Sequence, residues 1–157
     1  MSGFGNVCFW LAFTYVGIVI QMFVPRLDAL VPGVIHLLQA RAYKTLLWLM
    51  PIIILLQEGL GTRPFGGAIV WYTTIYLIYR LGERFFTSDT YVFVFFLSAA
   101  CGSAYYGFNV LLAPLQDLEI DSQLLMDLSF LQALYLPFAL SICKYLRREV
   151  KIGEEKS

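Results

Sequence analysis

The chain has 157 residues, of which 59% are hydrophobic, 17% are aromatic and only 14% are charged, and its formal net charge is zero. Because a soluble domain carries about a quarter charged residues, this composition excludes an ordinary soluble domain and predicts an integral membrane protein. The balanced charge also argues against a nucleic-acid partner, which requires a strongly basic face.

Apolar runs predict the fold class, because a helix of about 20 apolar residues suffices to cross the hydrocarbon core of a membrane. We predict an all-α integral membrane protein in which residues 1–157 form a single transmembrane domain of about six transmembrane helices. The predicted helices cover residues 5–24, 29–40, 43–58, 65–79, 91–112 and 124–143, and residues 144–157 form a basic tail.

The second predicted helix, residues 29–40, is short and could be re-entrant. Its length as a helix is only about 18 Å at 1.5 Å per residue, which is small for a crossing. If it crosses, six helices place both termini in the cytoplasm. If it is re-entrant or interfacial, five crossings place the N-terminus outside. The distribution of basic residues fits both arrangements.

Small residues recur on one side of the predicted helix 91–112. Ala99, Ser103 and Gly107 follow one another at intervals of four, and Ser98 and Gly102 repeat this spacing beside them. Such a face lets another helix backbone approach closely, so we predict a helix-packing face at Ala99, Ser103 and Gly107. Its partner is either another helix of this chain or a helix of another protein.

The end of the chain predicts its orientation. Lys144, Arg147, Arg148 and Lys151 follow directly after the last apolar run. Lys and Arg accumulate on the cytoplasmic side of membrane spans, so we expect a multi-pass protein with its C-terminus in the cytoplasm.

Polar residues within the apolar runs are few, and each has a plainer interpretation than catalysis. His36 has no second His, Cys or carboxylate at ligand spacing, so we expect a buried or interfacial histidine. Asn109 and Gln132 are typical of hydrogen bonds between membrane helices. Asp127 lies one turn into the last predicted helix, where a carboxylate complements the helix dipole.

The sequence contains no GxSxG, HExxH or Walker motif. The three cysteines, Cys8, Cys101 and Cys143, lie in apolar runs without a CxxC pair, so we expect small buried side chains. We therefore predict that the protein is not an enzyme and that it has no metal or cofactor site.

One stretch carries a family resemblance. Residues 51–80 read PIIILLQEGLGTRPFGGAIVWYTTIYLIYR, which is an apolar helix, an acidic residue, a loop with glycines and a second apolar helix. This order resembles the bacterial rod-shape-determining protein MreD family, and Glu58, Gly61, Pro64 and Gly66 are the matching loop positions.

The likeness extends in outline over nearly the whole chain. A short second segment contains Asp28 and Pro32, and the last span contains Pro137 and runs into a basic tail. The resemblance implies a bacterial inner-membrane protein with a fold similar to the substrate-binding S-components of vitamin transporters.

The function that this resemblance implies is that of a non-catalytic scaffold in the cell-shape and lateral peptidoglycan-synthesis machinery. The implied partners are membrane lipid, a bitopic MreC-like protein and wall-synthesis proteins. The alternative is a small-molecule (vitamin) binding subunit of a membrane transporter, which requires a pocket with convergent polar groups. The sequence offers only Asn109, Asp127 and Gln132 for such a pocket, so we favour the scaffold.

Overall fold

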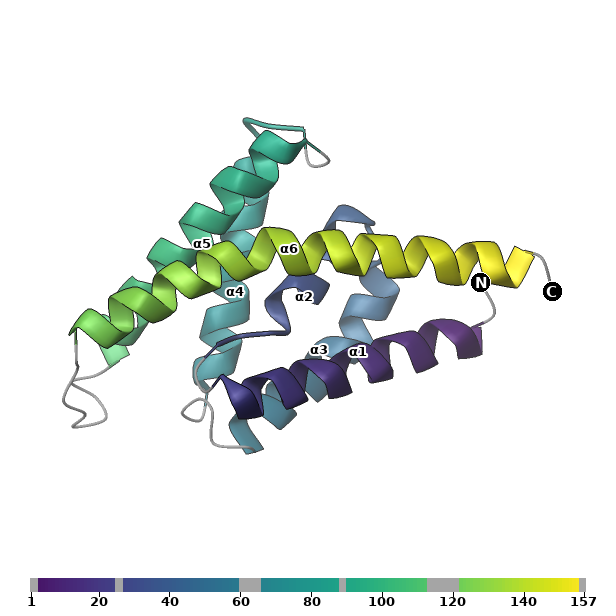
Figure 1. The fold of residues 1–157 in the computed structure, drawn as a ribbon, viewed down its shortest axis with the longest axis horizontal. Helices are drawn as coiled ribbons and strands as arrows, with labels where there is room; N and C mark the ends of the chain where they lie inside the picture. The colour runs from purple at the N-terminus through teal and green to yellow at the C-terminus, as the bar shows by residue number, and fades with distance from the viewer. Residues whose placement is uncertain (1–2, 25–26, 60–65, 88–89, 113–121, 156–157) are drawn as a thin grey trace.

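The computed structural model describes residues 3–24, 27–59, 66–87, 90–112 and 122–155, and within these residues the chain forms six helices and no strand (Figure 1). The helices are α1 Gly3–Phe23, α2 Val31–Gln39, α3 Tyr43–Gly59, α4 Gly67–Glu83, α5 Tyr91–Leu112 and α6 Ser122–Glu155. The all-helical fold class is confirmed. Helix α6 includes Pro137 and continues through the predicted basic tail as far as Glu155.

Three of the described helices are long and apolar enough to cross a membrane, over Gly5–Phe23, Tyr91–Leu111 and Ser122–Arg148, which indicates a membrane protein. The prediction of about six transmembrane helices is therefore wrong in number. Helix α2 has 9 residues, and α3 and α4 have 17 each. At 1.5 Å per residue these helices are about 14 Å and 26 Å long, below the roughly 30 Å of a hydrocarbon core.

Helix α2 lies inside the fold. Every residue from Val31 to Leu38 is buried, and α2 contacts α3, α4 and α6 (Figure 1). On its remaining side α2 meets α1, where the ring of Phe13 lies directly against Gly33. The short second segment is therefore a core element whose apolar surface is covered by protein.

The end of α2 has the backbone geometry of a Schellman motif. The N–H of Arg41 donates to the carbonyl oxygen of Leu38 at 3.0 Å, and the N–H of Ala42 donates to that of Leu37 at 3.0 Å. Arg41 has a φ of 51°, a left-handed conformation that usually belongs to glycine. This turn directs the chain from α2 into α3.

Helices α5 and α6 pack along an extended interface. Gly102 is buried at this interface, and a Cβ atom added to it would lie 2.9 Å from both the Ser129 carbonyl oxygen and the Ala133 Cβ. The close approach of the two helices therefore depends on a glycine at this position. Helix α4 packs against the other side of α5, where the rings of Tyr79 and Phe93 meet edge to face at 5.6 Å.

Helix α1 lies at the edge of the fold and runs opposite to α6, so that α1 begins at the end of the molecule where α6 ends (Figure 1). The Arg147 guanidinium lies 5.3 Å from the centre of the Trp10 ring, a cation–π contact between these helices. Asn6 Nδ2 donates to Thr45 Oγ1 at 3.0 Å. Cys101 and Cys143 are buried as expected, but Cys8 is exposed because it lies on the outer face of α1.

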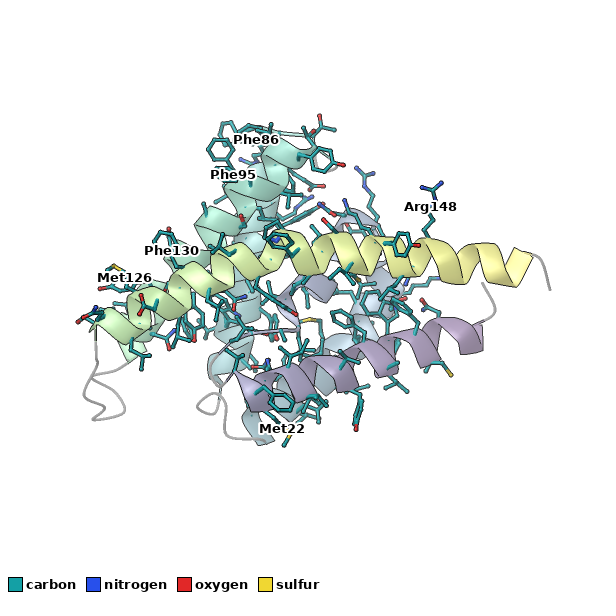
Figure 2. All side chains as sticks on the ribbon, viewed as in Figure 1. Met22, Phe86, Phe95, Met126, Phe130 and Arg148 are labelled. Atoms are coloured by element: carbon teal, nitrogen blue, oxygen red, sulfur yellow. The ribbon has the colours of Figure 1, made fainter. Side chains whose placement is uncertain are left out.

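Apolar side chains cover much of the outer surface. Figure 2 shows Met22, Phe95 and Phe130 projecting outward from α1, α5 and α6, and each is largely exposed. Large exposed apolar surfaces mark contact with a membrane or another protein, and all three long helices carry such residues.

Candidate functional site

Asp28 lies in the connection between α1 and α2 and is only 1% exposed. An ionisable group buried in a membrane protein is costly unless its polar atoms are satisfied, and it is a functional candidate by default. The structure brings polar groups from α3, α4 and α6 to this one residue, which we call the Asp28 network: Asp28, Gln57, Trp71, Tyr72 and Gln132.

Four donors converge on the carboxylate of Asp28. Oδ2 accepts a hydrogen bond from Trp71 Nε1 at 2.8 Å. Oδ1 accepts hydrogen bonds at 3.2 Å from Gln57 Nε2, from the Tyr72 hydroxyl and from the backbone N–H of Leu30. The bond from Leu30 is an Asx turn that bends the chain into α2. Three of these donors share Oδ1 and one binds Oδ2, so both oxygens of the carboxylate are engaged within the fold.

The side-chain amide of Gln132 binds the backbone of Asp28 in two directions. Its Oε1 accepts the N–H of Asp28 at 2.9 Å, and its Nε2 donates to the carbonyl oxygen of the same residue at 3.2 Å. Gln132 is completely buried in α6. The hydroxyl of Tyr135, one turn further along α6, donates to the carbonyl oxygen of Ala29 at 3.4 Å. This pairing satisfies backbone groups that have no helical partner, and it fixes the start of α2 against α6.

The chemistry of the Asp28 network is that of a structural anchor. Both carboxylate oxygens accept hydrogen bonds from donors of the same chain, so a ligand at this carboxylate would compete with these intrachain bonds. Among the described residues no three His, Cys, Asp or Glu side chains lie together in a way that could hold a metal ion. The network joins α3, α4 and α6 to the start of α2.

The other polar residues singled out from the sequence lie apart from one another. His36 is buried on α2, with its ring centre 6.1 Å from that of Trp10. Asn109 donates to the carbonyl oxygen of Tyr105 in its own helix at 2.8 Å, so this bond is not interhelical. Asp127 is exposed on α6. The bonds of Gln132 reach the backbone of Asp28, in the connection between α1 and α2, where a bond to another helix was expected.

Two loop positions of the family resemblance lie at helix ends, Glu58 in the last turn of α3 and Gly66 directly before α4. Glu58 Oε1 accepts a hydrogen bond from the N–H of Gly66 at 2.9 Å, which joins the two ends of this loop. Gly66 has a φ of 79°, which a side chain would strain. Gly61 and Pro64 lie outside the described residues. Glu58 and Gly66 thus form a contact that shapes the turn from α3 into α4.

The two small-residue stripes of α5 have different surroundings. Ser98 and Gly102 are buried, and Gly102 meets α6. Ala99 and Ser103 are exposed, and a Cβ atom at Gly107 would meet no atom within 4 Å. We call Ala99, Ser103 and Gly107 the outer α5 face. No described part of this chain packs on it closely.

Sequence reasoning did not select Gln57, Trp71 and Tyr72, and it treated Asp28 only as a position of the family resemblance. The residues whose side chains bind Asp28 are 29 to 104 residues away in the chain. One signal was present. Asp28 directly precedes an apolar segment too short to cross a membrane, and a carboxylate at such a place needs donors from other helices.

In comparisons with protein families, curated proteins and solved structures, no family model, protein or structure matches this chain. The fold and the site define a helical membrane protein with a buried polar anchor and an outward-facing stripe of small residues.

Proposed function

We propose that this protein is a non-catalytic scaffold of the bacterial inner membrane that acts by helix–helix contact with partner proteins. The observation that carries the proposal is the outer α5 face, where Ala99, Ser103 and Gly107 lie outward on a helix long enough to span a membrane. Helices in lipid associate through close packing of small residues, because lipid tails are as apolar as the side chains they replace.

The chemistry of this face suits a transmembrane helix. The Ser103 hydroxyl donates to the carbonyl oxygen of Ala99 at 3.0 Å, so its polar hydrogen is satisfied within α5. Phe96 and Tyr106, each three residues from a member of this face, are also exposed. Small residues on an exposed helix face allow an apolar helix to lie close along α5.

The resemblance to the MreD family supplies the biological setting of the proposal. The occupant of the outer α5 face is then the single transmembrane helix of a bitopic MreC-like partner, and the complex belongs to the cell-shape and lateral peptidoglycan-synthesis machinery. Lys144, Arg147 and Arg148 near the end of α6 support a cytoplasmic C-terminus.

A second candidate function is a small-molecule binding subunit of a transporter. The convergence of Asp28, Gln57 and Tyr72 favours it, because a ligand site needs several polar groups in one place. These groups are bonded to one another, however, and a ligand has to compete with intrachain hydrogen bonds. We therefore place the scaffold first.

Depletion of the protein in a rod-shaped bacterial host separates the two functions. The scaffold predicts that cells become round and that a bitopic partner is recovered with the tagged protein in mild detergent. The transporter subunit predicts a vitamin requirement in cells of normal shape and recovery of an ATPase module. The second pattern would refute the scaffold proposal.

A further inference from the structure

A basic cavity of about 550 Å³ lies at the opposite end of α4 from the Asp28 network. Its described lining contains three arginines and one carboxylate, which give a formal charge of +2. The lining residues are Arg41, Leu77, Arg80, Leu81, Glu83, Arg84, Phe86 and Thr87. Three arginines thus lie together beside the apolar side chains of α4.

The arginines come from two separate parts of the chain. Arg80 and Arg84 lie one turn apart at the end of α4, and Arg41 lies in the turn between α2 and α3. The left-handed conformation of Arg41, with its φ of 51°, costs about 1 kcal/mol relative to glycine. A strained arginine where glycine is usual suggests that its side chain has a role in the cavity.

The one carboxylate in the lining is already engaged. Glu83 Oε2 accepts a hydrogen bond from Arg80 at 3.1 Å, and its Oε1 accepts one from the Tyr79 hydroxyl at 3.2 Å. Within the described part of the chain, no ion pair or side-chain hydrogen bond links Arg41 or Arg84 to an acceptor. Two guanidinium groups therefore face the cavity with their charge unbalanced by described residues.

We propose that this cavity binds the phosphate group of an anionic phospholipid. Guanidinium groups match phosphate oxygens in a two-pronged geometry, and the hydroxyl of Thr87 offers a further donor. Leu77 and Leu81 line the same cavity and are more than half exposed, which provides an apolar track along α4 for an acyl chain. Basic pockets between membrane helices commonly hold anionic headgroups.

The test uses the full chain purified in a neutral detergent, with native mass spectrometry to measure lipid binding. Phosphatidylglycerol is the probe, phosphatidylcholine is the zwitterionic comparison, and inorganic phosphate is the soluble source of the same group. We expect phosphatidylglycerol to bind about tenfold more tightly than phosphatidylcholine. An excess of inorganic phosphate should leave the lipid bound, because it lacks the acyl chains.

Arg84→Gln is the diagnostic variant, and it should weaken phosphatidylglycerol binding about fivefold. Arg148→Gln is the matched control, because it removes the same charge from an exposed side chain on α6 (Figure 2). The control should bind as the unmodified chain does. Since Arg84 is exposed, the melting temperature without lipid should be unchanged in both variants.

Three results would overturn the proposal. Equal binding of the two lipids would mean that the cavity does not recognise an anionic headgroup. An equal loss in both variants would mean that lipid binding responds only to the overall charge of the protein. Complete displacement of phosphatidylglycerol by inorganic phosphate would assign the cavity to a soluble phosphate compound.

Discussion

Around Asp28, polar side chains from three helices are buried and bonded to one another, and the carboxylate accepts hydrogen bonds from four donors. On the outer α5 face, Ala99 and Ser103 are exposed and Gly107 has open space around it. Both regions depart from a simple apolar helix. The Asp28 network is buried and connects the helices of the fold, whereas the outer α5 face is exposed and leaves room for another helix.

This difference assigns stability and function to two different sets of residues. Changes in the Asp28 network should reduce the amount of folded protein. Changes on the outer α5 face should leave folding intact and reduce contact with a partner. The predictions that follow test this separation, from the largest expected effect to the smallest.

Asp28→Ala should have the largest effect on stability. It removes the carboxylate that accepts hydrogen bonds from Trp71 Nε1, the Tyr72 hydroxyl and the backbone N–H of Leu30. Each buried donor left without an acceptor costs about 1–3 kcal/mol, so we expect a loss of about 3 kcal/mol or more in the free energy of unfolding. Thermal unfolding in detergent and the yield of folded protein measure this loss.

Asp127→Ala is the matched control for that experiment, because it removes a carboxylate that is exposed on α6. It should leave the melting temperature nearly unchanged. Equal stability of the two variants would mean that the Asp28 network does not hold the fold together.

Gly102→Ala should destabilise the α5–α6 interface. The new Cβ atom would lie 2.9 Å from the Ser129 carbonyl oxygen and from the Ala133 Cβ. Overpacking of this kind costs about 1–3 kcal/mol. Gly107→Ala is the control on the same helix, and it should be neutral or stabilise by up to about 1 kcal/mol, because it adds helix propensity in open space. The reverse order of melting temperatures would contradict the assignment of the two stripes.

Gly66→Ala should lower stability by about 1 kcal/mol, because alanine is strained at a φ of 79°. Space is not the cause, since a Cβ atom at Gly66 would meet nothing within 4 Å. Gly59→Ala is the matched control, as it has the same open space without a left-handed backbone. If both variants unfold at the same temperature, the conformation of the α3–α4 turn is not what Gly66 provides.

The sequence was informative where one helix could be interpreted alone. The apolar run predicted at 91–112 coincides with α5, Tyr91–Leu112. It was less informative about α2, because an apolar segment of this length suits both a short crossing and a buried core helix. The number of membrane-spanning helices was overestimated for the same reason. Apolar residues indicate only that a segment avoids water. In α2 it is the rest of the protein, and not lipid, that excludes the water.

The sites divide in the same way. The Asp28 network depends on residues from separate helices, so spacing along the chain could not reveal it. The small-residue stripes of α5 were visible in the sequence. The sequence did not show which stripe packs within this chain. The structure shows it, because α6 packs against Gly102 of the stripe formed by Ser98 and Gly102.

Partner recovery with Ser103→Leu tests the central claim most directly. Ser141→Leu is the matched control, because Ser141 is also exposed and also donates to a carbonyl oxygen four residues earlier in its own helix. The tagged proteins would be purified in mild detergent, and the co-purifying bitopic partner would be quantified along with the melting temperature. We predict that Ser103→Leu lowers partner recovery several-fold at an unchanged melting temperature, while Ser141→Leu leaves both unchanged. Undiminished recovery with Ser103→Leu would contradict the account.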